Sequence, residues 1–322
     1  MTNVDIASQS PPIWIENPDW WEANEYRTGE LYLPGQSRLS ADDRAVLEQL
    51  AKAADGGKIH IPPMPKAAME AARILRLPDP EVEEIAKCIE LDPAMAAWLL
   101  KHANSALFGA RVPIDTVGHA VAHLGLRRLK SIILELAMKR MSDDVNSRFW
   151  AEREWKHAVA CAAISKELAR QLGMDVEMSY LAGLLHDIGR VPLLPELEKN
   201  QALPHLPGPD CPADIIMETL HRNVGLQVAQ SWDLPPAIID AIGSHLTGRL
   251  SDEESTARFP STRVAEAASD LCIALGIGRE RRPFAILECP SLLDLGFSPE
   301  LLVKWFKTEF QDVLTTLQSV TG

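Results

Sequence analysis

The stretch from Tyr180 to Leu194, YLAGLLHDIGRVPLL, contains the pattern that decides the fold. Its apolar side chains recur at the i, i+3, i+4, i+7 spacing of one buried helix face: Leu181, Leu184, Leu185 and Ile188. Ala182 and Gly183 make the opposite face small, which suits the close approach of a neighbouring helix. The stretch therefore predicts a helix that other helices cover on both faces.

An adjacent His186-Asp187 pair lies inside this apolar stretch. With histidine neutral, Asp187 is the only formal charge between Glu177 and Arg190. An ionised carboxylate in such a place costs several kcal/mol unless a cation, a metal ion or a set of hydrogen-bond donors compensates it. Asp187 is therefore expected to have partners elsewhere in the chain.

The composition limits the class of protein. Of the 322 residues, 46% are hydrophobic and 24% are charged, which is ordinary for a globular protein of one large domain or two smaller ones. A net charge of -13 argues against binding of nucleic acid or of an anionic membrane, since both need a basic surface. The chain has neither a signal-peptide pattern nor a run of ~20 apolar residues, so we expect a cytoplasmic location.

Helical periodicity covers most of the chain, and no period-2 pattern indicates strands, so the predicted fold class is all-α. Ser40 is expected to cap the first helix, and Asp79-Pro80 and Asp92-Pro93 are expected to begin two short ones. Longer helices are predicted over about 115–141, 147–172, 177–188, 213–231, 235–246, 261–276 and 299–320.

Three segments follow from this pattern. Residues 1–40 contain Trp14, Trp20 and Trp21 without a helical period, and we expect an irregular extension that packs on the domain or on a partner. Residues 41–280 form the main domain, with an N-terminal helical part over about 41–142 and a second part over about 146–278. Residues 281–322 form a C-terminal loop and helix.

Histidines and aspartates from different predicted helices are the candidate site residues, and a compact bundle can bring them together: His157, His186, Asp187, His221, His245 and Asp270. Imidazole and carboxylate ligands suit Fe, Mn, Ni or Zn. The five cysteines include no CxxC pair, which fits reduced thiols, and the absence of a cysteine near these residues argues against a thiolate zinc site. Buried, hydrogen-bonded histidines without a metal ion remain the alternative.

The order of several phrases resembles an HDOD domain over about residues 59 to 276: IPPMP at 61–65, NSALFG at 104–109, HDIGR at 186–190 and WDLP at 232–235. The resemblance implies an all-helical, HD-like bundle and a bacterial signalling or regulatory module without phosphohydrolase activity. By the wider HD pattern it implies one divalent metal ion at His157, His186, Asp187 and Asp270. His221 and His245 match positions where the related HD-GYP phosphodiesterases have further histidines.

The sequence also departs from the HD-GYP pattern. Leu246 stands in place of a second histidine, and the DGxGYP-like segment is missing. Those enzymes commonly have a lysine after HDIG, which assists proton transfer to the leaving group. Here Arg190 takes that position, and arginine, with a pKa above ~12, is a poor general acid. Arg153 lies where an upstream acidic ligand is expected. Leu246 and Arg153 thus replace two expected ligands, which argues against the second metal ion that two-metal phosphodiester hydrolysis uses.

Two functions from different classes follow. The favoured one is a non-catalytic regulatory module that binds another signalling protein, without nucleic acid or membrane, and with homo-oligomer formation left open. The alternative is a metal-dependent phosphohydrolase that acts on a nucleotide or cyclic dinucleotide. In that case Arg190 would hold the phosphate.

Overall fold

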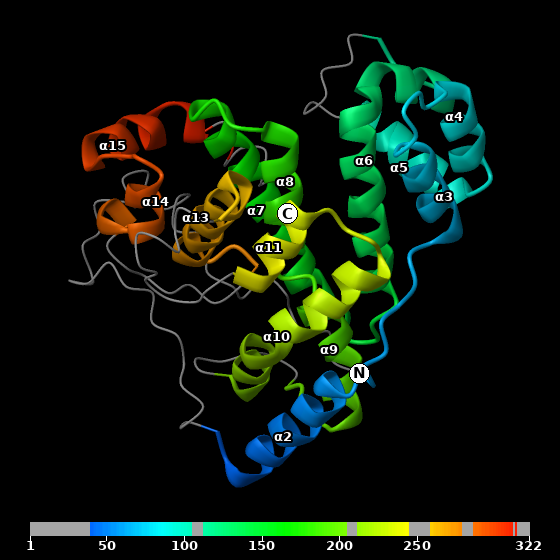
Figure 1. Ribbon diagram of the computed structural model, residues 1–322. Helices are drawn as coiled ribbons and strands as arrows, with labels where there is room; N and C mark the ends of the chain where they lie inside the picture. The colour runs from blue at the N-terminus through cyan, green and yellow to red at the C-terminus, as the bar shows by residue number, and fades with distance from the viewer. Residues whose placement is uncertain are drawn as a thin grey trace, which may run out of the picture.

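The computed structural model describes residues 39–104, 112–204, 211–244, 258–278, 286–311 and 313, and these residues form thirteen α-helices, a 3-10 turn and no strand (Figure 1). The all-α prediction is therefore confirmed. Among the described helices, none has the length and apolar character needed to span a membrane. The predicted N-terminal extension with its three tryptophans lies outside the described residues, apart from Leu39 and Ser40.

The N-terminal part consists of five helices: α2 (Ala41–Asp55), α3 (Lys66–Ile74), α4 (Val82–Glu90), α5 (Pro93–Ala103) and α6 (Val117–Asp143). In Figure 1, α3, α4 and α5 lie against α6. Ser40 and Asp92 cap α2 and α5 as expected, each accepting backbone N–H groups of the first turn. Asp79-Pro80 does not begin α4, because the N-cap of that helix is Glu81, whose backbone is extended. Pro80 disfavours the helical conformation at the preceding Asp79.

The second part consists of α7 (Arg148–Gln171), α8 (Val176–Leu185), α9 (Arg190–Lys199), α10 (Pro212–Ser231), α11 (Pro236–Ser244) and α13 (Pro260–Leu275). The helix expected over 177–188 ends at Leu185, and His186 to Gly189 form a turn before α9, a helix that periodicity did not predict. After it come η4 (Ile286–Glu288), α14 (Pro290–Asp294) and α15 (Pro299–Lys307), which is shorter than the helix expected over 299–320.

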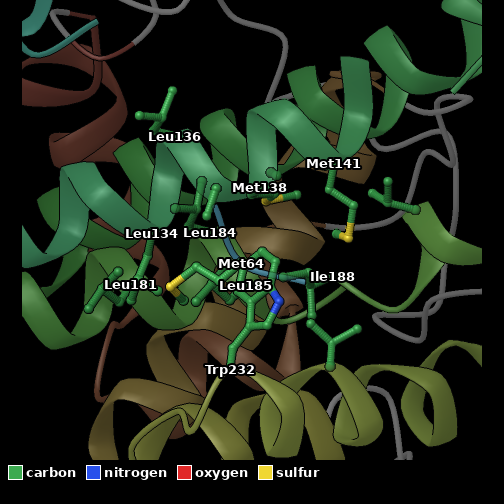
Figure 2. Close-up of a cluster of buried hydrophobic side chains, with 14 of the residues drawn as sticks. Met64, Leu134, Leu136, Met138, Met141, Leu181, Leu184, Leu185, Ile188 and Trp232 are labelled. Atoms are coloured by element: carbon green, nitrogen blue, oxygen red, sulfur yellow. The ribbon is translucent and has the colours of Figure 1, made fainter. Parts of the chain in front are cut away.

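A hydrophobic core joins the two parts where α6 meets α8. Figure 2 shows side chains of both helices gathered there, together with Met64 and Trp232: Leu134, Met138 and Met141 of α6, and Leu181, Leu184 and Leu185 of α8. The indole Nε1 of Trp232 donates a hydrogen bond to the Pro62 carbonyl at 3.2 Å. The IPPMP and WDLP phrases therefore meet in space and tie the start of α3 to the end of α10.

A second core lies on the other side of α7. Ala158 and Ala162 face the first core, whereas Cys161 and Ile164 face the second, which α13, α14 and α15 complete. Helix α7 is therefore buried on both sides.

Two glycines allow close helix contacts, and that of Gly183 is the one that the small face of the HDIG stretch predicts. A Cβ on Gly183 would lie 2.6 Å from the Cys161 carbonyl oxygen of α7. A Cβ on Gly189 would lie 1.9 Å from the His221 carbonyl oxygen of α10. Such distances exclude any larger residue without movement of a helix, so both glycines hold the HDIG turn tightly between α7 and α10.

Candidate functional site

Three histidines surround Asp187 at the turn between α8 and α9. One carboxylate oxygen, Oδ2, lies 3.4 Å from His186 Nε2 and 3.9 Å from His157 Nε2. The other, Oδ1, lies 3.3 Å from His221 Nε2. We call these four residues the His–Asp centre. No member is more than 6% exposed, and the contributing elements are α7, the HDIG turn and α10.

The histidine rings of the His–Asp centre are oriented by the backbone. Nδ1 of His157 lies 3.3 Å from the Ile277 carbonyl oxygen, Nδ1 of His186 lies 2.8 Å from that of Gly183, and Nδ1 of His221 lies 2.9 Å from that of Glu218. A carbonyl oxygen only accepts, so each Nδ1 carries the proton and each Nε2 of a neutral ring is left with its lone pair.

This orientation gives the centre its chemistry. Three lone pairs and a carboxylate face one another, and such a set of acceptors is stable only with a cation or additional protons among them. Imidazoles that donate Nδ1–H to backbone carbonyls are the usual form of histidine metal ligands. Ligand atoms of His157, His186 and Asp187 lie within 4.8 Å of one another. The residues therefore fit a divalent transition-metal ion, and a protonated histidine is the alternative compensation for Asp187.

The structure places Asp270, a predicted metal ligand, away from the His–Asp centre. Asp270, on α13, accepts hydrogen bonds from Ser291 Oγ at 2.6 Å and from Cys289 Sγ at 3.5 Å, both at α14. Burial raises the pKa of its carboxyl to about 6, although these two donors lower it. Its neighbour Ser269 is the residue that approaches His157, with Oγ 3.5 Å from Nε2. His245 lies outside the described residues.

A second buried polar group, which we call the arginine centre, lies beside the first. Its members are Arg153, Glu154, Arg190, Asp214 and Glu218. The Arg190 guanidinium donates to Glu154 at 2.9 Å, to Asp214 at 2.8 Å and to Glu218 at 3.0 Å. Arg153 donates to the other Asp214 oxygen at 2.9 Å. The Arg190 side chain is 1% exposed and that of Glu154 3%, so this pair is shielded from water, whereas Glu218 is partly exposed.

The arginine centre has no spare positive charge. Two arginines face three carboxylates, which leaves one excess negative charge. Arg153, at the position where an acidic metal ligand was expected, instead pairs with Asp214 and stacks on Trp150, with 4.8 Å between Cζ and the ring centre. A phosphate group that approached Arg190 would have to displace one carboxylate and tolerate the others.

The sequence did not lead us to expect thiols near His157. His157, Cys161 and Cys272 have ligand atoms within 4.8 Å of one another, so the expectation that no cysteine lies near the histidines is wrong. Cys161 follows His157 by four residues on α7, a spacing that places both on one helix face and could have revealed the pair. Nothing in the spacing connects Cys272 to either residue, because it comes from α13.

A comparison of sequences finds a relative of this chain. A protein of Treponema pallidum (strain Nichols) without a functional description is 29% identical over 194 residues, which are 58% of this chain and 37% of that protein. The chain thus spans little more than a third of this curated relative.

Two solved structures share the fold. A candidate metal-dependent phosphohydrolase from Shewanella amazonensis SB2B matches with a TM-score of 0.66 and 22% identity, covering 88% of this chain and 100% of that one. A candidate signal transduction protein from Marinobacter aquaeolei VT8 matches with a TM-score of 0.55 and 19% identity, covering 89% and 68%. At these identities the likeness shows the fold alone.

The family follows from the sequence match. The HDOD domain model matches residues 61–247, which is more than half of the chain and includes the HDIG turn, α10 and both phrases that meet at Trp232. This protein belongs to the HDOD domain family of the HD superfamily.

Proposed function

We propose that this protein is a non-catalytic regulatory module of HDOD type that acts in signal transduction by binding another signalling protein. The observation that carries the proposal is the closed arginine centre. Where a phosphohydrolase needs a free cationic position for the substrate phosphate, Arg190 is held by three carboxylates from α7 and α10.

Phosphate ester hydrolysis requires the phosphorus atom to reach an activated water molecule while cations neutralise the developing charge. The His–Asp centre is too deeply buried for direct contact with a phosphate, since its most exposed member, Asp187, is 6% exposed. The adjoining Glu154, Asp214 and Glu218 add negative charge on the side of α9. Burial and charge therefore both disfavour a bound phosphate.

A divalent ion such as Fe, Mn, Ni or Zn has a structural role in this proposal. Bound by His157, His186, Asp187 and His221, it supplies the positive charge that Asp187 needs. Backbone carbonyls orient the three histidines, and an ion held by them and Asp187 would connect α7, the HDIG turn and α10. The partner is expected to be a protein, because the net charge of -13 disfavours nucleic acid and anionic membranes.

The alternative is a metal-dependent phosphohydrolase, and the His–Asp centre is the observation that favours it. The full chain should be assayed with Mn or Fe against cyclic di-GMP and a nucleoside triphosphate, with Asp187→Ala as the matched variant. We expect the same rate with wild type, with the variant and with buffer. Turnover by wild type that Asp187→Ala abolishes would overturn the non-catalytic proposal.

A further inference from the structure

His157 has a second set of potential metal ligands besides Asp187 and the other histidines. Cys161 lies one turn further along α7, with Sγ 3.4 Å from His157 Nε2. Cys272 reaches the same place from α13, and the three ligand atoms lie within 4.8 Å of one another. All three residues are fully buried. They belong to two helices that pack directly together.

We propose that His157, Cys161 and Cys272 form a binding site for a thiophilic d10 cation, with Zn²⁺ as the natural ion and Cd²⁺ as its spectroscopic analogue. Zn–S and Zn–N bonds of about 2.3 and 2.0–2.1 Å place neighbouring tetrahedral ligand atoms about 3.5–3.8 Å apart. The observed separation of 3.4 Å between Sγ and Nε2 is close to that value.

Ser269 is the candidate for the fourth ligand of a tetrahedral ion. Ser269 Oγ, from α13, lies 3.5 Å from the same His157 nitrogen, and Ser269 is fully buried. In this proposal its hydroxyl is the fourth ligand, a neutral oxygen. The backbone fixes His157 for this role, because Ile277 O faces Nδ1 and leaves Nε2 for the ion. The close passage of Gly278 over α7 holds that carbonyl in place, since a Cβ there would lie 2.4 Å from His157 N.

Charge distinguishes this thiol site from the His–Asp centre. Two thiolates and a neutral imidazole balance Zn²⁺ completely, which lowers the cost of burying the ion among apolar neighbours such as Ile164 and Leu271. A divalent ion at the His–Asp centre retains one positive charge.

His157 Nε2 has one lone pair, so an ion held by the thiols withdraws His157 from Asp187. The two sites therefore compete for this histidine.

Cadmium uptake tests the thiol site directly. The full chain is unfolded, reduced and refolded with Cd²⁺, so that burial does not limit access, and circular dichroism checks the refolded state against untreated protein. The cadmium–thiolate charge-transfer absorption reports sulfur ligation, which the His–Asp centre cannot produce. We expect wild type to show this band and to hold the metal after desalting.

Matched variants assign the ligands. Cys161→Ser and Cys272→Ser each remove one of two Cd–S bonds, so the band should fall to about half or less in each and vanish in the double variant. Cys88→Ser, in α4, is the control and should leave the band unchanged. Asp187→Asn should retain it, which separates this site from the His–Asp centre. A refolded wild type without the band, or a band that persists in the double variant, overturns the inference, and neither result bears on catalysis.

Discussion

The His–Asp centre and the arginine centre are neighbours built on the same three segments, yet they solve the problem of buried charge in different ways. Glu154 precedes His157, Asp187 precedes Arg190, and Glu218 precedes His221, each by three residues. The two centres therefore lie about one helical turn apart along α7, the HDIG turn with α9, and α10. In one centre, acceptors face acceptors and require an added cation. In the other, Arg190 supplies that cation as a side chain.

This comparison supports the proposed non-catalytic function of a chain that retains HD residues. Phosphate chemistry needs adjoining positive positions that a substrate can reach. Here the position next to the His–Asp centre is filled by a guanidinium with its hydrogen bonds to carboxylates already formed. In the proposed function, these ion pairs leave no cationic position next to the His–Asp centre for a substrate phosphate.

Removal of the Arg190 charge should have the largest effect. Arg190→Met keeps much of the side-chain volume but leaves Glu154, Asp214 and Glu218 without their shared cation, at an expected cost of about 3–5 kcal/mol in the free energy of unfolding. Urea denaturation measures this loss. Arg127→Met, in an exposed ion pair with Asp175, is the control and should change stability by about 0.5 kcal/mol or less. Equal small effects in both variants would show that the arginine centre contributes little.

Removal of a metal ion from the His–Asp centre should have the second-largest effect on stability. An ion that binds only the folded protein adds about 2.7 kcal/mol when its free concentration is 100 times the dissociation constant. A chelator should therefore lower the Tm of wild type and of Arg127→Met, and should have much less effect on Asp187→Ala. Differential scanning fluorimetry with and without added Mn, Fe, Ni or Zn measures this. A wild type that holds no metal by elemental analysis and ignores both treatments would leave the His–Asp centre as a hydrogen-bonded network.

A third buried charge, at the junction of the two parts, should give a smaller, pH-dependent effect. His102 Nε2 lies 2.9 Å from Glu135, which also accepts from the Tyr180 hydroxyl at 2.7 Å. Burial lowers the pKa of His102, but the hydrogen bond and charge of Glu135 outweigh it and raise the pKa above its usual value. The pair therefore stabilises the fold fully below about pH 6.5, the unfolded value. That stability is lost as the pH rises through the higher folded pKa.

His102→Gln tests this third charge. The variant should lose about 1.5 kcal/mol at pH 6, the lower end of the range for a hydrogen bond to a charged group, and less at pH 9. Denaturation at both pH values measures the difference. A loss that is the same at pH 6 and pH 9 would show that His102 is neutral in the folded protein.

The sequence predicted the fold better than the site. Helical periodicity depends on residues close together in the chain, whereas the contacts of a site join residues of distant helices. Periodicity placed α7 within one residue at each end, and Gly183 correctly indicated a close helix contact. The resemblance indicated His221 as an additional histidine, and the structure brings it to Asp187. In contrast, the approach of Cys272 to His157 depends on how α13 packs on α7, which no spacing encodes. The carboxylates around Arg190 likewise come from two other helices.

The smallest effect is expected at Asp270, the predicted ligand that lies outside both centres. Its carboxylate contacts Ser291 and Cys289 at α14, so Asp270→Asn should leave the chelator-induced shift in Tm unchanged. Because burial raises the folded pKa to about 6, wild type should lose stability as the pH rises from 4 to 6, and the variant should lose less. Thermal melts with and without chelator at pH 4, 6 and 7 measure both effects. If Asp270→Asn abolishes the chelator response as Asp187→Ala does, then Asp270 is a ligand as the HD pattern implies, and α13 must move towards the HDIG turn when the ion binds.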